Sequence, residues 1–440
     1  MKQIIYKDFR CFSDLTVDFK SGLNLLVGDN ASGKTTILQG LKVALGAFFS
    51  GYSDENTHFT GLTISDFREV RIGDSVANEK PVSICFDYSD IMDPAIGFED
   101  TSEHRSSVNR ASKKNRTETK GLNNYNAYGK YLFDSLFDIE NKRQVKPLPL
   151  FASFTTEDIH SNRKLEEKRF KQYFHKPSFG YYECMQGNVF FPYWIKRLLV
   201  LTEGNKSIEE VEGVQQAIKK ALGEEGCNII SHMSVRPNQG KVYYHFIDER
   251  EVEAENLSDG YTRVVNIVTD IAFRCMLLNK GIYGSQACEK TIGTVLIDEV
   301  DLHLHPTLQA SVLKGLKNAF PKLQIIASTH APMVMTGVEP NDTNCVYKLF
   351  YTRDEGYQVH EIQPYGLDAS TIIETVLNLI PRVKEVQDKL DMLFDLIDSD
   401  KEEEARKLLL KLQSTFESSI PELNRAEAML NFTIEPDEED

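Results

Sequence analysis

The sequence has no long hydrophobic run. Apolar stretches such as VLIDEV at 295–300 are short and interrupted by charge, whereas a membrane-spanning helix needs roughly 20 consecutive apolar residues. The first residues, MKQIIYKDFR, contain neither the apolar core nor the small-residue cleavage site of a secretory signal. We therefore expect a cytoplasmic protein with no membrane partner.

Cysteine pairs are also missing. The seven cysteines form no CxxC motif, which argues against a structural zinc site and a disulfide framework and predicts reduced, buried thiols. The 440 residues, 41% apolar and 26% charged, are enough for one large α/β domain with insertions or for two lobes. The net charge of −16 argues against a protein that is coated all over with nucleic acid.

One segment nevertheless concentrates positive charge. Residues 104–120, HRSSVNRASKKNRTETK, contain six Lys or Arg against one Glu, and no aromatic residue. One interpretation is a mobile, solvated loop, and the other is an arm that contacts nucleic-acid phosphates. The sequence leaves both open.

What the sequence does contain is a phosphate-binding motif. GDNASGKTT at 28–36 has the spacing GxxxxGK[ST] and stands between an apolar, strand-like run at 23–27 and a stretch with helical spacing. The N–H groups of such a loop point at phosphates, with a helix N-terminus behind them. We expect Lys34 to reach the β- and γ-phosphates of ATP and the Thr35 hydroxyl to bind Mg²⁺. The predicted nucleotide-binding residues of this loop are Gly28, Asp29, Asn30, Ala31, Ser32, Gly33, Lys34, Thr35 and Thr36.

Two later segments supply catalytic candidates. Asp298 and Glu299 follow the strand-like run 294–297, which we expect to lie on a strand next to that of the P-loop. Asp298 would hold Mg²⁺ through water, and Glu299 would polarise the attacking water. A helix N-cap is the structural alternative. His330 ends another buried strand-like run, and because parallel strands end at one edge of a sheet, we expect it to sense the γ-phosphate.

A further motif narrows the class. LSDG at 257–260 opens a long amphipathic helix, and Ser258 by itself would be a good N-cap. Beside the other motifs, this segment resembles the LSxGx signature of ABC-type ATPases. In that family the signature contacts the γ-phosphate held by a second protomer. The resemblance implies a head-to-tail homodimer, or a higher homo-oligomer, with shared ATP sites. Its expected trans contacts are Leu257, Ser258, Asp259 and Gly260.

The resemblance is closer to one branch of the ABC-type ATPases. The opening IIYKDFRCFSDLTVDFKSGLNLLVGDNASGKTTIL resembles SMC- and RecF-like ATPases, and DEVDLHLHP at 298–306 resembles the OLD-like AAA_15/AAA_21 branch. The tripeptide at 8–10 stands where those ATPases have Asn-Phe-Arg, which implies a nucleotide contact from Arg10. Asp29 and Ala31 replace the Glu and Gly commonest in that P-loop.

A third contact to the metal site is expected between residues 147 and 162. An apolar strand-like run followed by polar residues resembles the Q-loop region of RecF-like proteins, which implies Glu157 or Asp158 as the contact. A helix start capped by Thr155 or Thr156 explains the same residues equally well.

The predicted fold is an α/β, ABC-type P-loop ATPase head with a helical subdomain, a polar insertion and a C-terminal helical tail. No heptad pattern is sustained, so we expect no long SMC-type coiled coil. The predicted divisions are 1–90 for the N-terminal lobe with the P-loop, 91–146 for the insertion, 147–255 for the Q-loop region and helical subdomain, 256–365 for the C-terminal lobe, and 366–440 for the tail with its acidic end.

The tail contains one motif that needs an explanation. Asp-Ser-Asp at 398–400 matches the Asp-x-Asp of a Toprim nuclease as text, but it stands between two helical runs with no Glu-bearing strand before it. We predict a helix–helix turn there. No HNH-like constellation of His and Asn is present either, so we expect the chain to have no nuclease site of its own.

The leading functional hypothesis is an ATP-dependent switch. The chain is similar to stand-alone AAA_21 ATPases of bacterial anti-phage systems, including Septu systems and systems attached to retrons, which implies a separate nuclease partner, often of HNH type. The alternative is a RecF-like DNA-binding ATPase in DNA repair, against which the acidic balance counts. A scaffold that binds ATP without much hydrolysis and a transporter subunit rank below both.

Overall fold

The chain divides into two units, Met1–Ala369 and Ser370–Asp440, which are described separately. The computed structural model describes residues 1–72, 75–77, 80–88, 105–138, 140, 143–156, 175–187, 191–203, 208–380, 382–416 and 420–432.

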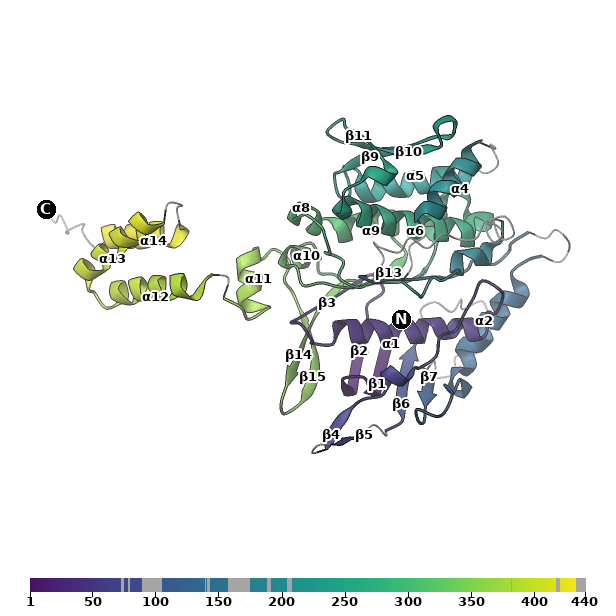
Figure 1. Ribbon diagram of the computed structural model, residues 1–440, viewed down its shortest axis with the longest axis horizontal. Helices are drawn as coiled ribbons and strands as arrows, with labels where there is room; N and C mark the ends of the chain where they lie inside the picture. Colours follow the sequence, from purple (N-terminus) through teal and green to yellow (C-terminus); the bar gives the residue numbers. More distant parts are fainter. Residues whose placement is uncertain are drawn as a thin grey trace. The chain divides into compact units, whose positions relative to one another are not determined.

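The first unit is built on a six-stranded sheet (Figure 1). Its strands at Leu23–Val27, Gly293–Ile297 and Leu323–Ser328 are buried along their whole length, as expected where helices cover both faces of a parallel sheet. The predicted strands at 23–27 and 294–297 are confirmed. In spatial order the strands are β15 (Gly356–Ile362), β14 (Cys345–Thr352), β3 (Leu23–Val27), β13 (Leu323–Ser328), β12 (Gly293–Ile297) and β8 (Leu150–Phe154). All neighbours run parallel except the β14–β15 hairpin.

The strand order corrects one prediction. The strand that ends at Asp298 does not neighbour the P-loop strand, because β13 lies between β12 and β3 and pairs with both. The chain leaves β12 through α8 (Pro306–Gln309) and α9 (Val312–Ala319) and returns beside it as β13. Strand β13 then pairs with β12 along one edge and with β3 along the other. Residues at the end of β13 therefore stand between the phosphate-binding loop and the acidic pair.

A second, antiparallel sheet lies on the other side of α1 (Lys34–Gly46), which contacts both sheets (Figure 1). Its order is β2 (Phe12–Asp18), β1 (Gln3–Phe9), β6 (Val82–Asp87) and β7 (Arg105–Arg110). The Tyr6 hydroxyl of β1 donates to the Ile37 carbonyl of α1 at 2.7 Å. Gly40 makes room for this ring, since a Cβ there would lie 2.1 Å from a Tyr6 ring carbon. A short ladder of β4 (Val70–Ile72) and β5 (Ser75–Ala77) is attached to this region.

Part of the basic segment is regular structure rather than loop. Residues 105–110 form β7, which pairs along its length with β6, so the loop interpretation is wrong for these six residues. Arg110 is used structurally: its guanidinium donates to the Leu62 and Lys113 carbonyls at 2.6 and 2.9 Å. Lys114, Arg116 and Lys120 are exposed. Helix α2 (Asn123–Ser135) follows and packs its tyrosines against Phe48.

The remaining helices of this unit form a layer around α6 (Asp259–Tyr283), whose residues from Arg263 to Asn279 are all buried. It contacts α4 (Phe191–Glu203) and α5 (Ile208–Leu222), and α5 in turn packs on α9. A small antiparallel sheet of β9 (Ile230–Arg236), β10 (Lys241–Phe246) and β11 (Glu251–Glu253) leads into α6. The short helices α7 (Ala287–Lys290) and α10 (Pro332–Thr336) belong to this unit, whereas α11 (Ala369–Thr375) begins at its last residue and continues into the second unit.

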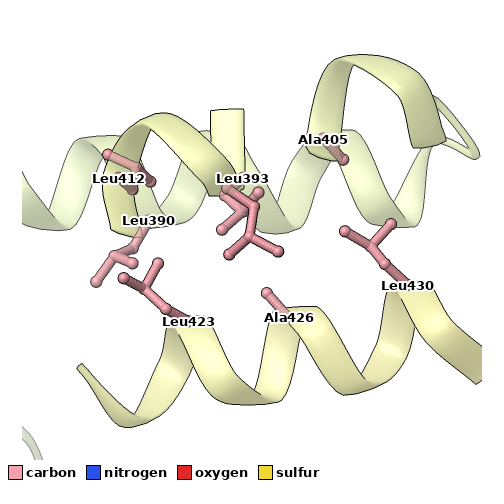
Figure 2. Packing of buried hydrophobic residues seen from close by; sticks show 8 residues of the cluster. Leu390, Leu393, Ala405, Leu412, Leu423, Ala426 and Leu430 are labelled. Carbon is pink, nitrogen blue, oxygen red and sulfur yellow. The ribbon is translucent and has the colours of Figure 1, made fainter. Parts of the chain in front are cut away.

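The second unit is a bundle of α12 (Lys384–Asp398), α13 (Glu402–Thr415) and α14 (Pro421–Phe432). Figure 2 shows its core, in which Leu393, Leu412, Leu423 and neighbouring Leu and Ala side chains converge between the helices. The Asp-Ser-Asp stretch lies where α12 ends, and Asp400 has a left-handed backbone with φ 54°. The prediction of a helix–helix turn is confirmed.

Candidate nucleotide-binding and hydrolysis site

The phosphate-binding loop connects β3 to α1, as predicted. Gly28 and Gly33 have φ angles of 144° and 98°, which side chains other than glycine rarely adopt. A Cβ on Gly28 would lie 2.3 Å from the Leu349 carbonyl oxygen, and one on Gly33 would lie 2.7 Å from the Phe12 ring. Both glycines of the motif are therefore required by the backbone and by the close packing around it.

Lys34 folds back into this loop. Its Nζ donates to the carbonyl oxygens of Gly28 and Asp29 at 2.8 and 2.9 Å, and the residue is only 5% exposed. Burial lowers the pKa of Lys34 to about 8, and the nearby carboxylates of Asp298 and Asp29 oppose this shift. An ammonium held by carbonyl oxygens is only partly compensated, so the anionic oxygens of a polyphosphate are better partners for it.

Thr35 and Asp298 come together as the sequence predicts. The Thr35 hydroxyl donates to Asp298 Oδ1 at 3.3 Å, and the Ser328 hydroxyl, at the end of β13, donates to the same oxygen at 2.5 Å. Ser328 also accepts the Glu299 N–H at 2.8 Å. This serine, which sequence reasoning missed, thus joins the ends of β12 and β13 and fixes the direction of the Asp298 carboxylate.

Glu299 and His330 line the same cavity as Lys34 and Thr35. Glu299 has a left-handed backbone with φ 48°, which is uncommon for a residue with a side chain and is typical of functional sites. Burial and the charge of Lys34 lower the pKa of His330. A neutral imidazole near pH 7 keeps both an N–H donor and a nitrogen acceptor.

The cavity measures about 360 Å³, within the range of small-molecule sites. Three of its lining residues, Cys11, Ser328 and Tyr357, are not among the predicted site residues. No pattern in the sequence points to Tyr357, because it reaches the cavity through the β14–β15 hairpin.

The signature stands apart from this cavity. Leu257, Ser258, Asp259 and Gly260 are absent from its lining, and Ser258 and Asp259 are exposed. Ser258 is the N-cap of α6, yet its side chain makes no capping hydrogen bond. The first amides of this 25-residue helix are therefore not capped by the serine hydroxyl, which leaves that hydroxyl available to a ligand.

Arg263 links the signature helix to the acidic pair. Its Nη2 donates to the carbonyl oxygens of Asp298 and Glu299 at 2.8 and 3.1 Å, and its Nη1 donates to the Thr155 carbonyl at 3.2 Å. The residue is 2% exposed. An arginine within the buried stripe of an amphipathic helix was the signal that could have found it, since Arg is rarely buried without a partner.

Arg10 is not among the residues that line the cavity, and two further predicted residues fall outside the described part of the chain. Arg10 Nε donates to Asp66 Oδ1 at 2.8 Å, and Arg10 is not among the lining residues, so a nucleotide contact from Arg10 stays a prediction. Glu157 and Asp158 lie outside the described residues. Thr155 and Thr156 are described, and the Thr155 carbonyl belongs to the Arg263 network.

The fold and the site define a class of protein. A phosphate-binding loop, an acidic pair and a histidine meet at one edge of a parallel sheet, with the signature on a separate helix, which is the arrangement of an ABC-type P-loop ATPase. The chain belongs to the AAA_21 family, described as "AAA domain, putative AbiEii toxin, Type IV TA system", which matches residues 23–336. None of the helices in the described ranges is long and apolar enough to span a membrane.

Three curated relatives are similar to this chain. It is 40% identical over 101 residues to the retron Vc95 probable ATPase of Vibrio cholerae serotype O1 biovar El Tor, covering 23% of this chain and 19% of that protein. It is 30% identical over 214 residues to the Septu protein PtuA of Bacillus mycoides (strain KBAB4), covering 47% and 26%. It is 26% identical over 384 residues to the Septu protein PtuA of Bacillus thuringiensis, covering 83% and 81%. The match thus spans less than a third of the first two relatives.

Proposed function

We propose that this protein is an ATP-hydrolysing switch subunit of a bacterial anti-phage system, and that its ATP-dependent dimer controls a separate nuclease. The observation that carries the proposal is the division of the site. Lys34, Thr35, Asp298, Glu299 and His330 line one cavity, while the signature residues are not among its lining residues and Ser258 and Asp259 are exposed. A second copy of the chain can bring its signature to the cavity.

Each side chain has a role in this proposal. Lys34 leaves its carbonyl partners and binds the β- and γ-phosphates. Glu299 orients and deprotonates the attacking water, and the neutral His330 hydrogen-bonds the γ-phosphate. The Thr35 hydroxyl and the Asp298 carboxylate, which already point at each other, fit Mg²⁺, Thr35 as a direct ligand and Asp298 through water. When bound, Mg²⁺ neutralises charge on the phosphates.

The dimer follows from the exposed signature. The Ser258 hydroxyl and the N-terminus of α6 would contact the γ-phosphate held by the second copy, where a helix dipole favours negative charge. Hydrolysis and phosphate release remove that charge and with it the attraction between the copies. ATP would then close the dimer and its hydrolysis would open it.

The nuclease partner is proposed from the relatives, which are named as parts of Septu and retron systems. The candidate partner surfaces are the exposed end of the basic segment and the second unit. That unit carries 18 acidic and 8 basic residues, hence a net charge of −10 out of the chain's −16. A strongly acidic module suits a partner with a basic surface, such as a protein that itself binds DNA.

Two measurements test the proposal. ATP turnover by the purified chain tests the enzyme, and co-expression with its neighbouring reading frames tests the partner. We expect a nuclease to co-purify and its DNA cleavage to change between ATP and a non-hydrolysable analogue. Turnover without any co-purifying nuclease would support the enzyme and contradict the switch.

A RecF-like DNA-binding role is the second candidate, and the exposed Lys114, Arg116 and Lys120 favour it. It predicts ATP-dependent duplex binding by the isolated chain that weakens steeply with salt, because each phosphate contact releases counterions. A filter-binding titration at two salt concentrations separates the two candidates.

A further inference from the structure

The described residues that line the nucleotide cavity are of two chemical kinds. Asp298, Glu299 and His330 supply carboxylates and an imidazole. Cys11 and Tyr357, which lie next to each other, supply a thiol and a phenol ring. The first group suits phosphate and metal chemistry, whereas the second suits an uncharged group.

The phosphate-binding loop sets the direction in which a nucleotide lies in the cavity. In a P-loop the lysine takes the β- and γ-phosphates and the first turn of the helix faces the phosphates nearer the sugar. The nucleoside of a bound nucleotide therefore leaves past Thr36, away from Asp298. The Cys11 thiol donates to Thr36 Oγ1 at 3.7 Å, so Cys11 marks this exit.

Tyr357 stands beside Cys11 at the same exit. Burial raises the pKa of Tyr357, and the neighbouring Cys11 thiol adds to this shift. The ring lies edge-on to Phe12, with centroids 5.2 Å apart and an interplanar angle of 84°. Phe12 in turn lies against Gly33 of the loop.

The hairpin holds this ring firmly. Tyr351, directly opposite on β14, lies with its ring centroid 5.0 Å from that of Tyr357. Strand β15 contacts β2, so the hairpin packs against the second sheet. Tyr357 remains half-buried and lines the cavity, which leaves ring surface available to a ligand.

We propose that Tyr357 is the nucleobase platform of this site: its ring stacks on the purine of the bound nucleotide. This inference rests on the proposed binding of ATP and adds a residue for the base, which no predicted motif supplies. Stacking needs the aromatic ring of Tyr357 and not its hydroxyl. Because every base has an aromatic face, the ring does not distinguish bases by their hydrogen-bonding groups, but it favours purines for their larger stacking area.

The test compares ATP with inorganic triphosphate, which has the phosphates but no base. Both probes are titrated with Mg²⁺ into the full chain carrying Glu299→Gln, to prevent turnover. Tyr357→Ala is expected to weaken ATP binding by about 5- to 150-fold, the usual range for one base–aromatic stack, and to leave triphosphate binding unchanged. Tyr357→Phe keeps the ring and should bind ATP as the parent does.

Matched controls separate this inference from the proposed function. Tyr365→Ala removes an exposed tyrosine (51%) just beyond β15 and should change neither affinity. If Tyr357→Ala changes both probes equally or neither, or if Tyr357→Phe loses as much ATP affinity as Tyr357→Ala, the platform is overturned while nucleotide binding stands. If the parent binds neither probe, the proposed function fails as well.

Discussion

The P-loop and the signature form an instructive pair, because both are loops that precede a helix N-terminus and both are predicted to bind phosphate. Inside one chain the P-loop is complete: Lys34 is 5% exposed and its ammonium is held by two carbonyl oxygens. The signature is exposed: Ser258 lies at the surface, and its side chain makes no hydrogen bond that caps its own helix. The difference is what the proposed dimer requires, in which each chain would bind a nucleotide with its own P-loop and offer its signature to the nucleotide of a second copy.

Removing the P-loop lysine should have the largest effect. Lys34→Ala deletes the one lysine among the described residues that line the cavity, and we expect ATP affinity to fall by about 100-fold or more, as when one partner of a buried charge pair is removed. Isothermal titration with ATP and Mg²⁺ measures this loss. Lys317→Ala is the matched control, because Lys317 is another lysine whose pKa burial lowers to about 8 but which donates to the Pro321 and Leu323 carbonyls. Equal losses in the two variants would contradict the assignment.

Glu299→Gln should separate hydrolysis from binding. The amide keeps the shape of the side chain but cannot take a proton, so turnover should fall by about 100- to 1,000-fold while ATP affinity holds. Phosphate release at saturating ATP measures the first quantity and titration the second. Glu289→Gln, at a surface glutamate paired with Lys220, should turn over normally. Unchanged turnover in Glu299→Gln would refute its role as the base.

Removing Arg263, which connects the signature helix to the acidic pair, should have an intermediate effect on stability and turnover. Arg263→Met removes three donors from the carbonyls of Thr155, Asp298 and Glu299, and we expect about 1–3 kcal/mol of lost stability, the range for a buried acceptor left unsatisfied. Turnover should fall more than ATP affinity, because the position of Glu299 is loosened while the P-loop is untouched. Thermal unfolding and kinetics together measure this. Normal turnover in a folded variant would show that Arg263 is only a packing residue.

The smallest effect is expected from pH. Free Lys34 has a pKa of about 8, so above pH 8 an increasing share of the protein must take up a proton to bind a polyphosphate. Affinity should be insensitive to this group below pH 8 and should fall by up to about tenfold per unit above it. Titrations at pH 7, 8 and 9 measure the slope. Lys317→Ala should keep it, and a flat profile to pH 9 would contradict a lysine that binds as the cation.

The sequence predicted the motifs well because each is a local pattern. The apolar runs before Gly28 and Asp298 indicated buried strands, and glycine spacing indicated the loop between strand and helix. The order of the strands could not be predicted in this way, since it depends on pairings between segments hundreds of residues apart. The position of β13 between β3 and β12 is one example. Because of it, Ser328 at the end of β13 hydrogen-bonds both Asp298 and Glu299.

The parts of the site that sequence reasoning missed have the same origin. Tyr357 lies on a strand with little burial and no motif, and only the hairpin brings it to the cavity. Arg263 carried a local signal, a cation in a buried stripe, but its partners are backbone carbonyls, which no residue pattern reveals. Arg10 was suggested as a ligand contact by a tripeptide alone; its guanidinium pairs with Asp66, and the nucleotide contact stays a prediction.

Mixing two inactive variants tests the shared site most directly. Lys34→Ala spoils the P-loop, and Ser258→Arg spoils the signature at an exposed position without affecting the core. Each variant alone should be inactive. An equimolar mixture should regain about a quarter of the parent's turnover, since half of the dimers are mixed and each has one intact site out of two. A mixture as inactive as its components would contradict a site shared between copies, and full turnover by Ser258→Arg alone would show that each chain hydrolyses ATP by itself.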